Sequence, residues 1–372
     1  MRSGALITGL ALAGLIAAAC GGAGPSPGGA PQATAASACF PVSGACPEEA
    51  RGLDGAGATF PAVIYTRWIS EYEKVTGVRV NYQSIGSGGG IKSISDRTLD
   101  FGATDGPMTD EQLAAAKGPM VHVPMVMGAV VPTYNLASVE QTLRFTPEAL
   151  AGIFLGEIAR WNDPRIASAN PGVTLPDADI TVVHRSDGSG TTYIWVDYLS
   201  KVSPAWASKV GRGTSVSWPV GVGGKGNEGV AGAVKQTPNS IGYVELIYAI
   251  QQKLPAGQVR NSSGAFVAPD LDSVSKAAEG VTLAPDLRAS ITDPGNAAAY
   301  PIAGFTWLLA YAEMPDRAKA LALTRYMWWA LHDGQRYAKD LGYAPLPADV
   351  VELASAKVRS ITSGGKAVLP AR

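Results

Sequence analysis

The sequence predicts an α/β protein whose strands form a mostly parallel sheet. Segments with strand patterns alternate with segments of helical periodicity from about residue 53 onward. The chain has 372 residues, enough for two domains of ordinary size or for one large domain. Hydrophobic residues make up 46% and charged residues 16%, so the folded part has ample material for a core.

The first nineteen residues have the layout of an export signal. MRSGALITGLALAGLIAAA carries one positive charge at Arg2, continues as an apolar stretch from Ala5 and ends in small residues. The stretch is too short for a convincing membrane span. Residues 1–19 are therefore predicted to be a signal peptide.

The segment AAACGG at 17–22 resembles a bacterial lipobox. In that motif the cysteine, here Cys20, becomes the acylated first residue of the mature protein, which predicts an anchor in the membrane. Ala17 departs from the motif, because leucine is usual three places before the cysteine. The alternative is cleavage near this point by ordinary signal peptidase.

Residues 20–49 are predicted to be a lipid-anchored, flexible tether. Between residues 21 and 37 the chain is uncharged, rich in Gly, Pro, Ala and Ser, and without large apolar side chains, so it cannot bury enough surface to fold. Cys39 and Cys46 follow, seven residues apart. In an exported protein we expect a disulfide between them; metal ligation is the alternative, which the lack of nearby histidines disfavours.

Helical and strand patterns then alternate through the first half of the folded part. Residues 60–77 are predicted to be a helix, because Pro61 stands near its first turn and Gly77 at its end. The predictions that follow are a strand over 78–83, a loop over 86–90, a short helix over 91–99, a strand over 100–105, and one or two buried strands over 122–135.

The alternation continues towards the C-terminus, which is why we assign the whole folded part to one fold class. The remaining predictions are a helix near 146–159, a strand over 180–186, a helix over 191–202, a Gly-rich stretch over 221–229 that leads into a helix, a strand over 240–249, and helices over 315–332 and 347–359.

Three segments share one local design, in which a Gly-rich loop with Ser or Thr precedes a helix. They are GAGATFP (55–61), IGSGGGI (85–91) and RSDGSGTT (185–192). The first N–H groups of a helix have no partner inside it and carry positive potential, while glycine lets the backbone approach a ligand closely. Such a loop is often plain helix capping. Three of them in one chain favour a shared site for an anion.

Arg185 and Asp187 add charge to the third loop. Two residues apart on a strand, their side chains point to the same side. A carboxylate that orients an arginine also partly neutralises it, so the arginine can bind an anion and still release it. The alternative is a structural ion pair near the surface, which would contribute little.

Asp105 ends the segment DFGATD and predicts selectivity among anions. A carboxylate repels a fully deprotonated tetrahedral anion but accepts a hydrogen bond from one that retains a proton. Phosphate near neutral pH has such a proton and sulfate has none. At about 4 Å and an effective dielectric near 20, the repulsion is roughly 4 kcal/mol, or about a thousandfold in affinity. The alternative role is capping of the following turn.

Several classes of function find no support in the sequence. The net charge of −1 and the lack of a basic cluster argue against nucleic-acid binding. The nucleophile-elbow pattern does not occur in the folded part from about residue 53, and the P-loop motif does not occur in the chain. His122, His184 and His332 lack metal-ligand spacing, and no cofactor or metal is expected. Two alternatives stay open, namely an exported phosphoesterase-like enzyme and a ligand-free surface scaffold.

At these segments the chain resembles the substrate-binding protein of the bacterial phosphate ABC importer. The resemblance extends over most of the chain from about Asp54. Its motifs are GAGATFPAVIY (55–65), VNYQSIGSGGGIK (80–92), DFGATDGPM (100–108), RWNDPRIASANPGV (160–173), HRSDGSGTTYIW (184–195), WPVGVGGKGNEGV (218–230) and IGYVE (241–245).

The resemblance implies which residues contact phosphate. Asp105 would be the acceptor, Arg185 the cationic partner, and Asp187 the partner of that arginine. The remaining contacts implied by position are Thr59, Phe60, Ser87, Ser189, Gly190 and Thr191. Gly88 departs from the family, in which a second serine is frequent at that position.

The resemblance also implies the two-lobed periplasmic-binding-protein fold of type II, with a ligand cleft between lobes joined by a hinge. Lobe one would combine 50–131 with 303–372, and lobe two would span 132–302. Phosphate binding would close the hinge. The expected protein is a monomer outside the cytoplasm, periplasmic or anchored to the outer face of the cell membrane, with the permease subunits of the importer as partners and no enzymatic activity.

Overall fold

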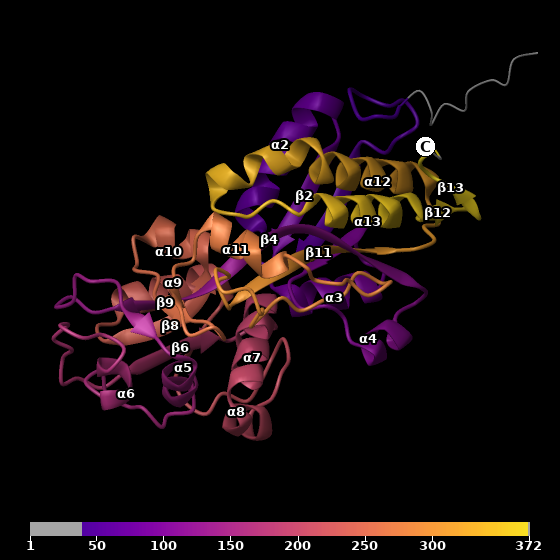
Figure 1. The fold of residues 1–372 in the computed structure, drawn as a ribbon. Coiled ribbons are helices and arrows are strands. Elements are labelled where there is room, and N and C mark those ends of the chain that lie inside the picture. Colours follow the sequence, from indigo (N-terminus) through magenta and orange to yellow (C-terminus); the bar gives the residue numbers. More distant parts are fainter. Residues whose placement is uncertain (1–38, 371–372) are drawn as a thin grey trace, which may run out of the picture.

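The computed structural model describes residues 39–370 and contains an eight-stranded mixed sheet with helices packed on it (Figure 1). The strand order is β2-β1-β3-β11-β4-β8-β6-β7. These strands are β1 (Gly52–Gly57), β2 (Arg79–Ser84), β3 (Phe101–Thr104), β4 (Met120–Asn135), β6 (Thr181–Arg185), β7 (Val222–Gly224), β8 (Ser240–Glu245) and β11 (Ala303–Tyr311).

Helices and short strands complete the described part of the chain. The α-helices are α2 (Ala62–Thr76), α3 (Ser87–Ser95), α4 (Asp110–Ala115), α5 (Pro147–Phe154), α6 (Pro164–Ala167), α7 (Gly190–Val202), α8 (Pro204–Lys209), α9 (Gly226–Gln236), α10 (Leu246–Gln252), α11 (Leu271–Ala278), α12 (Arg317–Leu331) and α13 (Ala348–Arg359). Two 3-10 helices span Asp333–Tyr337 and Lys339–Leu341. The short strands are β5 (Arg144–Phe145), β9 (Gln258–Arg260), β10 (Phe266–Val267), β12 (Thr362–Ser363) and β13 (Lys366–Ala367).

The long strand β4 joins two groups of strands. Its residues 120–129 pair with β11, and residues 130–135 pair with β8, in both cases antiparallel. On one side β1 lies between β2 and β3, and on the other β6 lies between β8 and β7, in both cases parallel. The sheet is therefore parallel only within its two outer groups. The segment 122–135 forms one strand, which pairs first with β11 and then with β8 and is buried along nearly its whole length.

The α/β class is confirmed, with shifts at the ends of some elements. The predicted loop over 86–90 is wrong: α3 already begins at Ser87, after Gly86 at a φ of 88°. The predicted strand over 240–249 ends at Glu245, whose side chain accepts a hydrogen bond from the Ile247 N–H and so starts α10. The first helix matches closely, with Pro61 at its N-cap and Gly77 left-handed at its C-cap.

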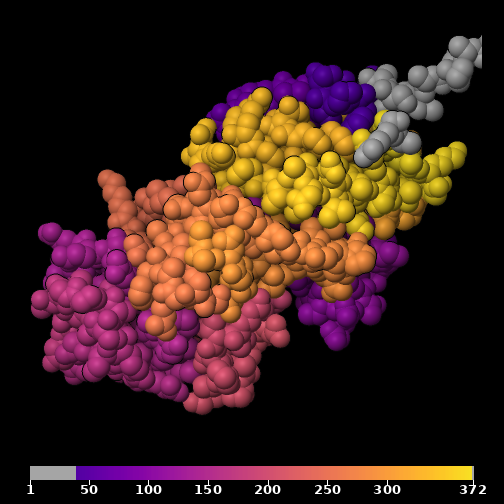
Figure 2. All heavy atoms as spheres, viewed as in Figure 1, coloured from indigo at the N-terminus to yellow at the C-terminus, as the bar shows by residue number. Residues whose placement is uncertain are grey.

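The helices divide between the two groups of strands. Helices α2, α3, α12 and α13 pack on the half that contains β1, β2 and β3, whereas α7, α9 and α10 pack on the half that contains β6 and β8. In the space-filling view the indigo and yellow segments form one end of the molecule and the magenta and orange segments form the other (Figure 2). The strands of each half are therefore covered by a separate set of helices.

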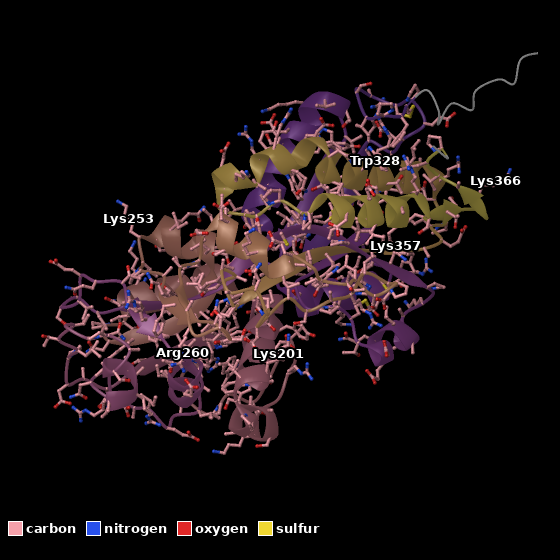
Figure 3. The ribbon with its side chains drawn as sticks, viewed as in Figure 1. Lys201, Lys253, Arg260, Trp328, Lys357 and Lys366 are labelled. Carbon is pink, nitrogen blue, oxygen red and sulfur yellow. A yellow bond between two sulfur atoms is a disulfide. The ribbon has the colours of Figure 1, made fainter. Side chains whose placement is uncertain are left out.

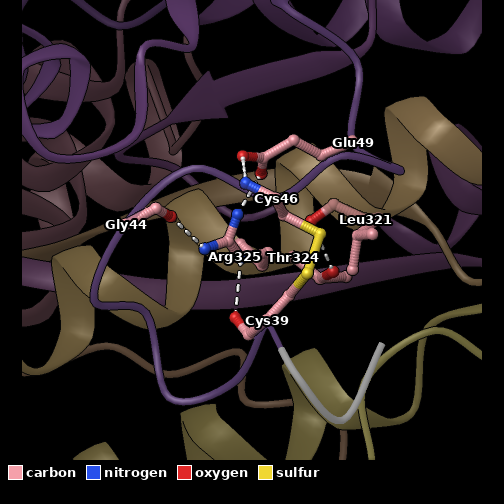
Figure 4. The surroundings of a disulfide bond; sticks show 7 residues. All are labelled: Cys39, Gly44, Cys46, Glu49, Leu321, Thr324 and Arg325. Carbon is pink, nitrogen blue, oxygen red and sulfur yellow. Dashed lines mark hydrogen bonds and ion pairs between the residues drawn. A yellow bond between two sulfur atoms is a disulfide. The ribbon is translucent and has the colours of Figure 1, made fainter. Parts of the chain in front are cut away.

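Residues 39–49 are packed against the rest of the protein. Cys39 and Cys46 form a disulfide, which confirms the predicted pairing. Glu49 forms an ion pair with Arg325 of α12, and the Arg325 guanidinium also donates to the carbonyl oxygens of Cys39 and Gly44 (Figure 4). Residues 39–49, which we assigned to the tether, therefore lie against α12.

The other N-terminal predictions concern residues outside the described part. The signal peptide over 1–19, the lipidated Cys20 and the tether up to residue 38 all belong to this group. No helix within residues 39–370 is long and apolar enough to cross a membrane.

Candidate anion-binding site

The predicted site segments meet where strands of the sheet end. The three predicted loops follow β1, β2 and β6, and Asp105 follows β3. In an open α/β sheet, ligands bind at the carboxyl ends of the strands, at the point where the strand order reverses. Here that place lies between the two outer groups of strands, and each group contributes loops to it.

Arg185 is held by Asp187 from the same loop. The guanidinium Nε donates to Oδ1 at 2.7 Å, and Nη2 donates to Oδ2 at 2.5 Å. Burial tends to raise the pKa of Asp187, but the hydrogen bond and the charge of Arg185 hold it below its ordinary value. Asp187 is therefore an anion that fixes the plane of the guanidinium.

The remaining arm of the guanidinium faces two hydroxyl groups. Nη1 of Arg185 lies 3.2 Å from Oγ1 of Thr59 and 3.5 Å from Oγ1 of Thr191. Thr59 comes from the loop after β1 and Thr191 from the first turn of α7, so this arm joins the two halves of the molecule. All three residues are buried.

The N-termini of α3 and α7 face each other across the same place. The Ser87 hydroxyl, in the first turn of α3, accepts hydrogen bonds from the Gly190 N–H at 3.0 Å and from the Asp105 N–H at 3.3 Å. Beside it the Gly88 N–H donates to the Gly188 carbonyl at 2.9 Å. Two ends of positive potential are thus brought together, which is the arrangement that binds anions.

Asp105 is a buried carboxyl group without a hydrogen-bond partner among the described residues. The residue is 1% exposed, and neither Oδ1 nor Oδ2 is hydrogen-bonded within the part of the chain that the structure describes. Burial raises the pKa of Asp105 to about 7, although the Thr306 side chain and the charge of Arg185 act in the opposite direction. An unpaired buried carboxyl group is costly, so its retention at this place calls for a partner.

Phe60 and Ser189, two of the predicted contacts, take part in bonds that hold their loops. The Phe60 ring is buried and its carbonyl accepts from the Tyr343 hydroxyl at 2.7 Å. The Ser189 side chain caps α7 by accepting from the Thr192 N–H at 3.0 Å, and its own N–H donates to the Thr214 carbonyl at 2.7 Å. Ser189 thus has the helix-capping role that was the alternative to anion binding for these loops.

Two residues that the sequence predictions omitted reach into the same cluster. Asn227, at the start of α9, donates to Thr59 Oγ1 at 2.7 Å and to Thr191 Oγ1 at 3.0 Å. Tyr248 of α10 donates to the Thr59 carbonyl at 2.5 Å. A usable signal was present for Asn227, because GVGGKGNEG is a fourth Gly-rich stretch that leads into a helix.

The histidines take structural positions. His122 Nε2 accepts from the Met108 N–H at 3.1 Å, and burial lowers the His122 pKa to about 4. The His184 ring stacks on Trp218 with ring centres 4.8 Å apart, and His332 stacks on Trp328 at 4.3 Å. Within residues 39–370, no group of three or more His, Cys, Asp or Glu side chains could hold a metal ion.

Basic side chains at the surface do not form the site. Lys201, Lys253 and Arg260 lie on the half that contains β6 and β8, and Lys357 lies on the other half (Figure 3). Arg185 differs from them because it is only 3% exposed. The positive charge of the site is thus internal and local.

Comparison with known proteins identifies relatives of high similarity. The family model described as the PBP superfamily domain matches residues 28–330. The phosphate-binding protein PstS of Xylella fastidiosa is 46% identical over 303 residues, covering 81% of this chain and 83% of the relative. The protein of the same name from Pasteurella multocida is 45% identical and covers 86% of this chain and 93% of its own length.

Solved structures show the same fold at lower identity. The phosphate-binding protein from Stenotrophomonas maltophilia has a TM-score of 0.64 at 18% identity, covering 82% of this chain and 93% of that protein. An ABC-type phosphate transport receptor from Vibrio cholerae has a TM-score of 0.53 at 18% identity, covering 79% and 100%. The architecture is therefore that of the two-lobed periplasmic binding proteins. Together with the relatives above, this shows that the chain belongs to the PstS family of phosphate-binding proteins within the PBP superfamily.

Proposed function

We propose that this protein binds inorganic phosphate outside the cytoplasm and delivers it to the permease of an ABC importer, and that the cluster around Arg185 and Asp105 is its binding site. The observation that carries the assignment is the convergence of hydroxyl groups, two helix N-termini and one oriented arginine on a carboxyl group that has no hydrogen-bond partner within residues 39–370. Hydrogen-bond donors and an acceptor in one buried cluster suit an anion that is itself still protonated.

The donors of the proposed site are Arg185 Nη1, the hydroxyl groups of Thr59, Ser87 and Thr191, and the N–H groups at the starts of α3 and α7. In the described structure several of these groups bond to one another, for example Gly190 to Ser87. Exchange of such bonds for bonds to a phosphate oxygen would keep each group satisfied. The Ser189 hydroxyl and the loop around Phe60 would complete the shell from either side.

Asp105 is proposed to give the site its selectivity. Its carboxylate would accept the hydrogen bond that a protonated phosphate donates. Because the carboxylate is buried, this bond would remove the free-energy cost of an unpaired buried charge. Sulfate at neutral pH has no proton to donate, so the same carboxylate would repel it. For two unit charges about 4 Å apart, the repulsion is roughly 4 kcal/mol at an effective dielectric near 20.

Hinge closure is proposed to couple binding to transport. Lobe one would comprise 50–131 and 303–372, and lobe two would comprise 132–302, with β4 and the start of β11 as the crossings. Thr59, Ser87 and Asp105 then lie on lobe one and the Arg185 loop on lobe two. A ligand bonded to both lobes favours the closed form, which a permease can distinguish from the open form.

We further propose that the protein acts as a monomer tethered by a lipid on Cys20. The export signal and the lipobox-like segment support this location, and the segment up to residue 38 would give the folded part its reach from the membrane. The relatives are named as binding proteins, which favours a carrier over a phosphoesterase or a ligand-free scaffold.

Calorimetric titration tests the proposal. The protein in phosphate-free buffer is titrated with phosphate and with sulfate, and the titrations are repeated with Asp105→Asn. We expect stoichiometric phosphate binding without turnover, negligible sulfate binding, and a much smaller difference between the two ions in the variant. Asp96→Asn is the matched control, because Asp96 lies at the exposed end of α3.

The outcomes separate the parts of the proposal. No phosphate binding by the unaltered protein would refute the function. Phosphate binding with an unchanged preference in Asp105→Asn would leave the function standing and remove Asp105 from the account of selectivity. Release of phosphate from a phosphomonoester would favour the enzyme instead.

A further inference from the structure

Asn227 lies at the centre of the hydroxyl cluster, at the start of α9, and is fully buried. Its Nδ2 is 2.7 Å from Thr59 Oγ1 and 3.0 Å from Thr191 Oγ1, and its backbone N–H is 3.3 Å from Thr59 Oγ1. Thr59 and Thr191 belong to different halves of the sheet. Asn227 therefore bonds to both sides of the proposed site at once.

The orientation of the Asn227 amide is determined by its other neighbour. Its Oδ1 lies 3.0 Å from the backbone nitrogen of Glu245, at the end of β8. A backbone N–H can only donate, so the oxygen of the amide has to face Glu245. The NH₂ group of the amide consequently faces the two threonines, and both of its hydrogens are directed at hydroxyl oxygens.

This arrangement determines where the threonine hydroxyl hydrogens point. A hydroxyl group has two lone pairs and one hydrogen. Thr59 Oγ1 is approached by Asn227 and by Arg185 Nη1 at 3.2 Å, and Thr191 Oγ1 by the same two side chains, with Arg185 at 3.5 Å. With its lone pairs engaged, each oxygen keeps only its hydrogen for a further bond.

We infer that Asn227 is a positioning residue that makes the Thr59 and Thr191 hydroxyls donors towards the bound anion. Ser87 is engaged in a similar way, since its oxygen accepts from the Asp105 N–H and, until a ligand takes that donor, from the Gly190 N–H. All three hydroxyls then present hydrogens, and Asp105 is the acceptor. The inference rests on the proposed phosphate site.

The test is phosphate titration of Asn227→Ala and Asn227→Asp. The alanine variant leaves the hydroxyls without their donor, and we expect affinity to fall roughly tenfold, the effect of one hydrogen bond. The aspartate variant presents an acceptor to both hydroxyls and turns their hydrogens away from the ligand. Its added negative charge acts in the same direction, so we expect a loss on the order of a hundredfold or more.

A double-mutant cycle separates positioning from general damage. If Asn227 acts through the hydroxyl of Thr191, then Thr191→Val should cost much less affinity in the Asn227→Ala background than in the unaltered protein. Additive losses would refute the inference. The same would follow if Asn227→Asp bound phosphate as tightly as the unaltered protein.

Asn135→Asp is the matched control for folding. Asn135 donates to the Val234 and Lys235 carbonyls at the far end of the same helix, α9. Its replacement should lower the melting temperature without changing phosphate affinity. If Asn135→Asp weakened phosphate binding as much as Asn227→Asp does, the effect would come from displacement of α9, and the inference would fail. Absence of phosphate binding by the unaltered protein would overturn the proposed function together with the inference.

Discussion

Asp187 forms a bidentate ion pair with Arg185, in which Nε donates to Oδ1 at 2.7 Å and Nη2 donates to Oδ2 at 2.5 Å. The pairing uses two of the three guanidinium nitrogens and leaves the third, Nη1, facing the hydroxyls of Thr59 and Thr191. The Gly226 N–H adds a third bond to Asp187 at 3.1 Å. The carboxylate is thus itself held, so it can transmit an orientation to the arginine.

Asp187→Ala should weaken phosphate binding by roughly tenfold to a hundredfold, because the guanidinium loses the bidentate partner that fixes its plane. Two effects compete, since removal of a negative charge also strengthens the attraction of Arg185 for an anion. We expect orientation to dominate because Arg185, Thr59 and Thr191 are buried. Calorimetry measures the affinity, and tighter binding by the variant would contradict this account. Asp163→Ala is the control, since Asp163 pairs with Arg165 at the surface in the same manner.

Asp105 should make the stability of the phosphate-free protein depend on pH. Its pKa is about 7 in the folded protein and ordinarily 3.8, so between these values the folded state binds more protons than the unfolded state. The free energy of unfolding therefore falls as pH rises from about 4 to about 7. The total is at most about 4 kcal/mol, and opening of the cleft would reduce it.

The check is denaturant unfolding of the unaltered protein and of Asp105→Asn between pH 4 and 8. The stabilisation that the variant gains should grow with pH up to about 7 and then level off. Asp96→Asn should show no such growth, because the partner Lys92 lowers the pKa of Asp96. A gain in Asp105→Asn that stays constant over the whole range would show that Asp105 does not titrate there.

Gly86→Ala should impair closure of the two halves. Gly86 has a φ of 88°, and a Cβ on it would lie 2.4 Å from Asp187 Oδ2 and 2.7 Å from the Gly188 carbonyl. The methyl group would thus hold the second loop away from the third, and overpacking of this kind costs about 1–3 kcal/mol. We expect phosphate affinity to fall by roughly fivefold to a hundredfold.

Gly172→Ala separates the clash from the backbone strain. Gly172 has a similar φ of 83°, but nothing lies within 4 Å of its Cβ position. Both variants should lose stability because alanine is strained at positive φ. Only Gly86→Ala should lose affinity. Equal affinities in the two variants would show that the loops need not approach so closely.

The sequence predicted much of the fold because periodicity and end signals are local. Pro61 and Gly77 mark the first helix to within two residues. The antiparallel pairs in the middle of the sheet could not be read in this way, since β4 meets β11 and β8 from distant parts of the chain. Glu245 likewise ends β8, because its side chain accepts from the Ile247 N–H and starts α10. The residue pattern of the strand does not predict this bond.

The sequence predictions selected residues where charge or glycine content is unusual and omitted residues of ordinary type. Arg185, Asp187 and Asp105 stand out in their segments, and the structure brings the first two into contact. Asn227 and Tyr248 are common residue types whose importance depends on contacts with Thr59, which is 168 and 189 positions away. Side-chain contacts over such separations depend on the folded sheet, so local patterns do not contain them.

Glu49→Gln should destabilise the protein without changing phosphate binding. Glu49 and Arg325 are buried, and Arg325 also donates to the Cys39 carbonyl at 3.1 Å and to the Gly44 carbonyl at 2.7 Å. Removal of one partner leaves a buried charge uncompensated, which costs about 3–5 kcal/mol. The cluster joins residues 39–49 to α12 and shares no residue with the proposed site (Figure 4).

Denaturant unfolding and phosphate titration together check this prediction, with Glu48→Gln as the matched control. Glu48 is exposed, so the same change of chemistry at the neighbouring position should leave stability within about 0.5 kcal/mol of the unaltered protein. A similar small loss in Glu49→Gln would show that residues 39–49 contribute little to folding. A large loss of affinity would instead couple this N-terminal segment to the cleft, because α12 packs on β1, the strand that leads to Thr59.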